Sequence, residues 1–132
     1  MKKNTDLGLL ILRLAVGVLF LLHGIAKIGH LEGVQYLLSE KGLPAFISYG
    51  VLVGEVLAPI LLIIGYRTRL AAVVVMFTAL AAIWLAHSHE IFALSQHGGW
   101  AIELLGLYLF GAKALFFTGG GRLAVSTKNR WD

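Results

Sequence analysis

Four long apolar stretches divide the chain and constrain its fold more than any other feature of the sequence. They cover residues 7–27, 46–65, 70–87 and 100–117. Each approaches the ~20 residues that an α-helix needs to cross ~30 Å of hydrocarbon. Backbone amides must find their hydrogen bonds inside such a segment, which favours helices. The pattern therefore predicts an all-α membrane protein, a four-transmembrane-helix bundle that forms a single domain over residues 1–132.

The composition supports the bilayer as the solvent of this chain. Apolar residues make up 58% of the sequence and charged residues only 14%, whereas a soluble domain has roughly a quarter charged residues. No cysteine is present, which removes disulfide exchange, thiolate metal ligation and cysteine nucleophiles from consideration. The net charge is +4, and the placement of the basic residues along the chain is explained by membrane topology. We therefore expect no nucleic-acid partner.

The basic residues cluster in alternate connections between the apolar stretches. Under the positive-inside rule, this asymmetry places both chain ends and the second loop in the cytoplasm, an N-in/C-in topology. The first stretch contains Arg13 and no A-x-A-like site follows it, so we expect a retained span and not a cleaved signal. The residues that set the topology are Lys2, Lys3, Arg67, Arg69, Arg122, Lys128 and Arg130.

The first outer loop, residues 29–45, is predicted to contain a short interfacial helix. Leu31, Val34, Leu37 and Leu38 recur at helical spacing, and the following glycine and proline end the pattern. The segment after the final glycines is expected to be loosely ordered.

Small residues in the second stretch predict close helix contacts. Gly50, Gly54 and Ala58 are spaced so that two membrane helices can approach closely. Two interpretations remain open, namely packing inside the bundle and a homodimer contact through these three residues. Pro59 should kink this helix and free a carbonyl one turn back, near Glu55.

Basic side chains inside the first stretch share one face of the predicted helix. Arg13, Gly17, Phe20, Gly24 and Lys27 fall on a single helical stripe. His23 precedes the lysine by one turn, at the flank of the stripe. Because the stripe also carries two glycines, this face should contact protein and not lipid.

Depth and side-chain direction predict that several polar groups converge. Glu55 should lie ~13 Å below the outer surface at a rise of ~1.5 Å per residue. Helical side chains lean toward their own N-terminus, so groups on oppositely running helices approach one another. Arg13 should lie apart, near the cytoplasmic side, and reach the inner interface or a helix-end carbonyl. The residues expected in one outward-opening pocket are His23, Lys27, Glu55, His87 and Glu103.

These polar residues have two interpretations because charges in hydrocarbon cost a few kcal/mol each. A pair between Glu55 and His23 or Lys27 can hold the helices in register, or the group can form a ligand, proton or metal site. On the outer side, His87, His89 and Glu90 could bind copper or zinc, or simply belong to a solvated loop.

The segment "RLAVGVLFLLHGIAK" resembles the opening R-L-x-x-G-x-x-F-x-x-x-G-x-x-K pattern of the DoxX family. The resemblance continues through "GEVLAPILLIIGYRTRLAA" and ends near "GGGR". It implies a bacterial four-helix protein of the cytoplasmic (inner) membrane. Relatives are linked to quinone-dependent redox chemistry, including a thiosulfate–quinone oxidoreductase, and others accompany copper and oxidative-stress systems. The matching positions are Arg13, Gly17, Phe20, Gly24, Lys27, Gly54 and Glu55.

Two functions from different classes follow. In the first, the chain is a redox-associated subunit that binds quinone or a similar lipid-soluble molecule. Glu55 and His23 would serve proton transfer, Phe20, Trp84 and Trp100 would flank a ring, and a redox partner subunit would supply electrons. In the second, the chain is a non-catalytic accessory protein of a membrane complex, or handles copper at the outer side. Whether the protein is an enzyme is left open by the sequence.

Overall fold

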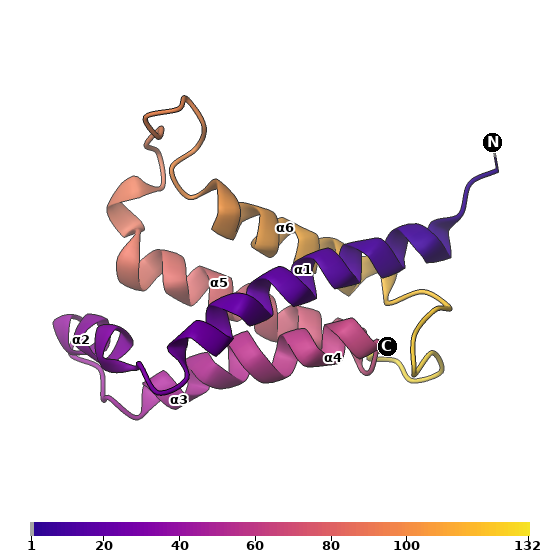
Figure 1. The fold of residues 1–132 in the computed structure, drawn as a ribbon, viewed down its shortest axis with the longest axis horizontal. Helices are drawn as coiled ribbons and strands as arrows, with labels where there is room; N and C mark the ends of the chain where they lie inside the picture. Colours follow the sequence, from indigo (N-terminus) through magenta and orange to yellow (C-terminus); the bar gives the residue numbers. More distant parts are fainter. Residues whose placement is uncertain (1) are drawn as a thin grey trace.

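The computed structural model describes residues 2–132, which are helical apart from turns and loops (Figure 1). Three helices are long and apolar enough to cross a membrane. The first is α1 (Thr5–Lys27) and the third is α5 (Thr68–Ala86). The second, Ile47–Ile64, is a continuous rod of three parts. These parts are α3 (Ile47–Leu52), the π-helical segment η1 (Val53–Leu57) and α4 (Ala58–Ile64).

The remaining helices are shorter. They are α2 (Glu32–Glu40), the 3₁₀ turn η2 (Ser88–Glu90) and α6 (Glu103–Thr118). The α6 helix has 16 residues and begins three residues later than the fourth apolar stretch. The structure therefore confirms an all-helical membrane protein with three helices of spanning length, and places a shorter helix within the fourth stretch.

The long helices pack as a ring. Helix α1 lies against η1 and α4, α4 lies against α5, α5 against α6, and α6 returns to α1 (Figure 1). Their shared core contains Phe20, Leu62, Val75 and Leu115, all fully buried. Many other large apolar side chains point outward, as expected where lipid covers the surface.

Glycines set the close contacts between the first two spans. A Cβ on Gly24 would overlap the carbonyl oxygen of Glu55, and a Cβ on Gly17 would lie 3.0 Å from the carbonyl oxygen of Pro59. Backbones can approach this closely only where no side chain intervenes. The first helix is thereby held directly against the second span.

The structure gives no support to the predicted homodimer contact through Gly50, Gly54 and Ala58. Gly54 and Ala58 are buried inside the chain's own bundle, and a Cβ on Gly54 would lie 2.9 Å from Cβ of Thr78 on α5. Gly50 faces open space. Gly54 and Ala58 therefore serve packing within one bundle, which was the alternative interpretation of the pattern.

The predicted kink at Pro59 takes the form of a π turn. Proline has no N–H for the carbonyl of Glu55, four residues earlier. The helix responds by widening locally, and the N–H of Ala58 bonds to Val53, five residues back. Such π segments are rare and often accompany functional sites.

The helix predicted in the first outer loop is present as α2. Its apolar residues Val34 and Leu38 are buried, while Tyr36 is exposed. Just beyond the helix, the ammonium of Lys41 lies 5.0 Å from the ring centre of Trp84 on α5, a cation–π contact. Helix α2 is thus held against the start of the second span and the end of the third.

The segment after α6 is not loosely ordered, contrary to the sequence-based expectation. The N–H of Val125 bonds to the carbonyl of Ile64 at 3.1 Å, and that of Arg69 bonds to Trp131 at 2.8 Å. Asp132 forms an ion pair with Arg67 at 3.1 Å. This segment is therefore tied to the turn between α4 and α5.

The carboxyl of Asp132 has an unusual pKa. Burial alone would raise that pKa, but hydrogen bonds from Ser126 and the backbone of Asn129, with the guanidinium of Arg67, lower it from 3.8 to about 2. The lowered pKa indicates that these contacts stabilise the ionised carboxylate in the folded protein.

Candidate functional site

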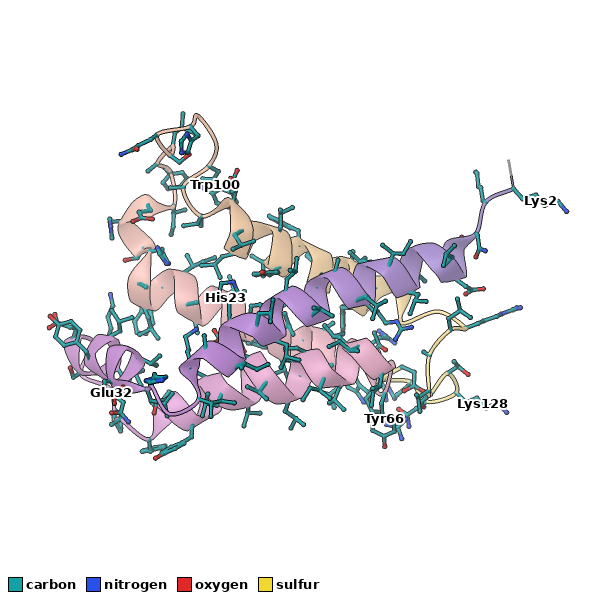
Figure 2. All side chains as sticks on the ribbon, in the orientation of Figure 1. Lys2, His23, Glu32, Tyr66, Trp100 and Lys128 are labelled. Atoms are coloured by element: carbon teal, nitrogen blue, oxygen red, sulfur yellow. The ribbon has the colours of Figure 1, made fainter. Side chains whose placement is uncertain are left out.

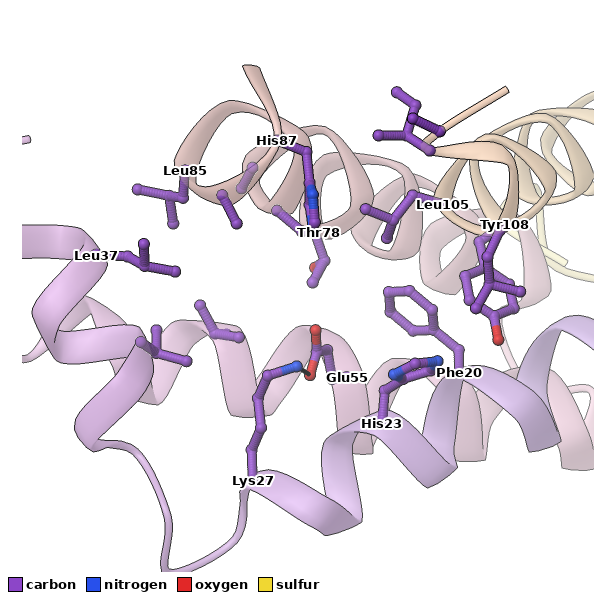
Figure 3. A pocket seen from close by; sticks show the side chains of 18 residues that line it. Phe20, His23, Lys27, Leu37, Glu55, Thr78, Leu85, His87, Leu105 and Tyr108 are labelled. Carbon is purple, nitrogen blue, oxygen red and sulfur yellow. Dashed lines mark hydrogen bonds and ion pairs between the residues drawn. The ribbon is translucent and has the colours of Figure 1, made fainter. Parts of the chain in front are cut away.

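A cavity of about 410 Å³ lies between α1, the second span, α5 and α6, with α2 at one side (Figure 3). Its walls are mainly apolar and include Phe20, Leu37, Leu85 and Leu105. A few polar side chains interrupt this lining. This composition is typical of sites that bind small apolar molecules and orient them by a few polar contacts.

The strongest polar feature of the cavity is an ion pair between Lys27 and Glu55. Lys27 Nζ lies 2.6 Å from Glu55 Oε2, and the two side chains are 31% and 5% exposed, respectively. An unpaired carboxylate at this depth would be costly. The ammonium compensates the carboxylate charge, and both groups line the cavity (Figure 3).

Local backbone structure brings these two charges together. Gly24, one turn before Lys27, allows α1 to touch the backbone at Glu55. Glu55 itself lies in the π-helical segment η1, whose wider turn changes the direction of its side chain relative to a regular α-helix. Gly24, Lys27 and Glu55, which all belong to the sequence motif, therefore lie next to one another in the structure.

Aromatic side chains form one end of the cavity (Figure 3). The ring of Tyr108 on α6 meets Phe20 edge-on at 5.0 Å between ring centres, and His23 edge-on at 5.8 Å. Phe20 was predicted to flank a bound ring. Tyr108 was not singled out from the sequence, because nothing in its spacing separates it from other aromatic residues of an apolar stretch.

The other predicted ring-flanking residues, Trp84 and Trp100, lie outside the cavity lining. Trp84 is engaged by Lys41. Trp100 donates a hydrogen bond from Nε1 to the carbonyl of Ile91 at 2.5 Å, which fixes the outer loop.

Four of the five residues predicted to share a pocket line this cavity: His23, Lys27, Glu55 and His87. Glu103 does not. It is the first residue of α6, so it lies at the very end of that helix. Its exposed side chain leans back toward Gly99, where a Cβ would lie 2.6 Å from Glu103 Oε2.

The loop after α5 does not assemble the predicted metal ligands. His87 Nδ1 lies 3.2 Å from one oxygen of Glu90, and His89 Nε2 lies 3.3 Å from the other. Among residues 2–132, no three His, Asp or Glu side chains are arranged to hold a metal ion. The geometry therefore gives the copper or zinc hypothesis no support.

Arg13 lies apart from the cavity, as predicted, at the opposite end of the bundle. It is fully buried, and its Nη1 donates to the carbonyl of Leu62 at 3.1 Å. Its Nη2 donates to the carbonyl of Leu123. Of the two predicted partners, the helix-end carbonyl is the one found, since Leu62 lies in the last turn of α4.

Comparison with known proteins identifies the family. The DoxX family model matches residues 8–88. The Bacillus subtilis (strain 168) protein named "Putative oxidoreductase CatD" is 32% identical over 83 residues, which are 63% of this chain and 62% of that protein. The chain thus spans less than two thirds of the length of that relative.

A second relative is the "Inner membrane protein YqjF" of Escherichia coli (strain K12). It is 30% identical over 89 residues, 67% of this chain and 68% of that protein. No solved structure matches the chain significantly. The family match, the apolar helices and this relative agree: the chain belongs to the DoxX family and is an integral protein of the bacterial inner membrane.

Proposed function

We propose that the protein binds a quinone or a similar lipid-soluble ring in the cavity beside Glu55, as a redox-associated membrane subunit. The observation that carries this proposal is the partly buried Lys27–Glu55 pair in a mainly apolar cavity of about 410 Å³. A quinone ring needs apolar walls and a few groups that can donate hydrogen bonds or protons to its oxygens. The ammonium of Lys27 and the imidazole of His23 supply such donors.

The cavity is accessible to a molecule dissolved in the bilayer. Two lining residues, His23 on α1 and Leu104 on α6, are themselves exposed. We therefore infer that the cavity opens through the seam between these two helices, beside the Phe20–Tyr108 contact. A hydrophobic ligand can enter from the lipid, while its tail remains outside between apolar side chains.

The chemistry assigned to this chain is the handling of protons. Reduction of a quinone to a quinol takes up two electrons and two protons. Carboxylate, imidazole and ammonium groups exchange protons but not electrons, so a partner reductant supplies the electrons. The word "oxidoreductase" in the name of the Bacillus relative supports a redox context for the proposal.

We further propose four membrane spans with the N-in/C-in topology. The α6 helix rises only about 24 Å at ~1.5 Å per residue, so residues 100–102 would complete the crossing. The alternation of basic residues supports this topology.

Binding of short-chain quinones to variants tests the proposal. Wild-type protein in mild detergent is titrated with ubiquinone-1 and with menadione, and bound ligand is measured by equilibrium dialysis. Glu55→Gln keeps the shape of the side chain but removes the charge that pairs with Lys27. Without that charge, the ammonium of Lys27 is no longer held in the cavity as a donor to the quinone. Because a hydrogen bond to a charged group contributes about 1.5–3 kcal/mol, we expect binding to weaken about tenfold or more.

Glu103→Gln is the matched control, since it removes a carboxylate from the same end of the bundle but outside the cavity. It should bind like the wild type. Folding of each variant is checked by its circular dichroism. Equal affinity of folded Glu55→Gln and wild-type protein for both quinones would refute the proposed site.

A further inference from the structure

A second cavity, of about 400 Å³, lies at the opposite end of the bundle. It is an open cavity lined by the end of α6, the glycine turn Gly119–Gly121 and the segment that follows, together with Asp6 and Arg69. This is the end that carries Lys2 and Lys128 (Figure 2). The cavity is as large as the first, but its lining is polar and basic.

Three arginines line this cavity: Arg69, Arg122 and Arg130. Arg69 donates from Nε to the carbonyl of Phe116 at 2.8 Å and from Nη1 to the carbonyl of Arg130 at 2.7 Å. These bonds fix the guanidinium while using two of its five N–H donors. Arg122 and Arg130 are exposed and take part in none of the ion pairs found among residues 2–132.

Two carboxylates also line the cavity, but they are already engaged. Asp132 is paired with Arg67 and accepts hydrogen bonds from Ser126 and the backbone of Asn129. Asp6 accepts the backbone N–H of Arg122 at 3.0 Å. Positive charge therefore remains in excess around this cavity.

A buried cation lies directly behind the glycine wall. A Cβ on Gly120 would lie 2.6 Å from Thr68 Oγ1 and 3.4 Å from Arg13 Cδ. Arg13 Nε and Thr68 Oγ1 are buried, and neither finds a hydrogen-bond partner in the part of the chain that the structure describes. Arg13 has carbonyl partners but takes part in no ion pair there. Its charge is weakly screened in this environment and acts across the thin wall.

We propose that this second cavity binds a phosphate group. Guanidinium groups match the oxygens of phosphate in geometry and charge, and here three of them surround a cavity backed by a buried fourth. The phosphate would belong to the headgroup of an anionic phospholipid or to a small free phosphate. Phe117, 72% exposed, lines the same cavity and offers an apolar surface to the glycerol and acyl part of a lipid.

The test uses paired variants with equal loss of charge. Arg122→Gln combined with Arg130→Gln removes two cavity guanidiniums but keeps the backbone groups that bond to Asp6 and Arg69. Lys2→Gln combined with Lys128→Gln removes two charges outside the cavity lining. Native mass spectrometry after reconstitution in mixed phosphatidylglycerol and phosphatidylcholine measures retained lipid. Thermal unfolding with glycerol 3-phosphate or inorganic phosphate measures the response to free phosphate.

We expect selective retention of phosphatidylglycerol, or a rise in unfolding temperature with a free phosphate, and the two arms identify the source. In the arginine variant, the affinity for the recognised ligand should fall about tenfold or more, because hydrogen bonds to charged groups are lost. It should persist in the lysine variant. The proposal is overturned if neither ligand is recognised, or if both double variants lose recognition equally, which would indicate nonspecific surface charge.

Discussion

Replacing Gly24 with alanine tests the helix contact that places Glu55 beside Lys27. A Cβ at this position would lie 2.6 Å from the carbonyl carbon of Glu55 and 2.8 Å from Val56 Cγ2. Ordinary contacts between carbon atoms are ~3.5–4.0 Å, so α1 must move away by about 1 Å. The neighbour is backbone and cannot rotate aside. Overpacking of this kind costs about 1–3 kcal/mol, of which the better helix propensity of alanine offsets up to about 1 kcal/mol.

Gly8→Ala is the control for this substitution because it lies on the same helix and a Cβ there meets no atom within 4 Å. It keeps the propensity gain and has no clash, so it should stabilise the protein. Unfolding temperature is followed by the fluorescence of the native tryptophans in detergent. We expect a lower midpoint for Gly24→Ala and an equal or higher midpoint for Gly8→Ala, relative to wild type. Midpoints that move together would refute the close α1–η1 contact.

Three further predictions concern the opposite end of the bundle and the topology. Arg13→Ala should destabilise the fold by about 2–5 kcal/mol in denaturant unfolding, since it leaves a cavity and carbonyls without donors. If the variant and the wild type have the same free energy of unfolding, the buried arginine does not stabilise the fold. The depressed pKa of Asp132 gives stability that is present above pH 3.8 and is lost as pH falls toward about 2. Hydrogen exchange of the Arg69 amide should therefore show less protection at the lower pH, and Asp132→Asn should remove that dependence. Single cysteines at Ser95 and Thr127 should react with impermeant thiol reagents from opposite sides of the membrane, and labelling from one side would exclude the N-in/C-in proposal.

The sequence predicted those features that depend on helical periodicity. The stripe that joins Arg13 to Lys27 correctly indicated a protein-facing side of α1. The same reasoning separated Arg13 from the outer groups, and the structure places it at the carbonyl end of α4. Periodicity suffices here because a straight helix fixes which side chains share a face.

Features that depend on where a helix begins or widens were harder to predict. Glu103 was expected in the pocket because it falls within the fourth apolar stretch, but α6 begins at this residue. Pro59 indicated a kink, but the absence of its N–H does not by itself decide whether the helix bends or widens into the π turn that carries Glu55.

Some contacts between residues far apart in the sequence were also not predicted. The segment that ends at Asp132 reads as a polar tail, yet its hydrogen bonds with Arg67, Ile64 and Arg69 fix it in place. Tyr108 enters the site through its contacts with Phe20 and His23. Pairings between residues this far apart leave no local pattern in a single sequence.

Photolabelling with an azidoquinone tests the central claim most directly, namely that a lipid-soluble ring binds beside Glu55. The labelled protein is digested and the modified residues are located by mass spectrometry. We expect modification on the residue 20–27 part of α1 and the residue 104–108 part of α6, and competition by excess unlabelled quinone. Label spread over the lipid-facing residues and unaffected by that competitor would contradict the account.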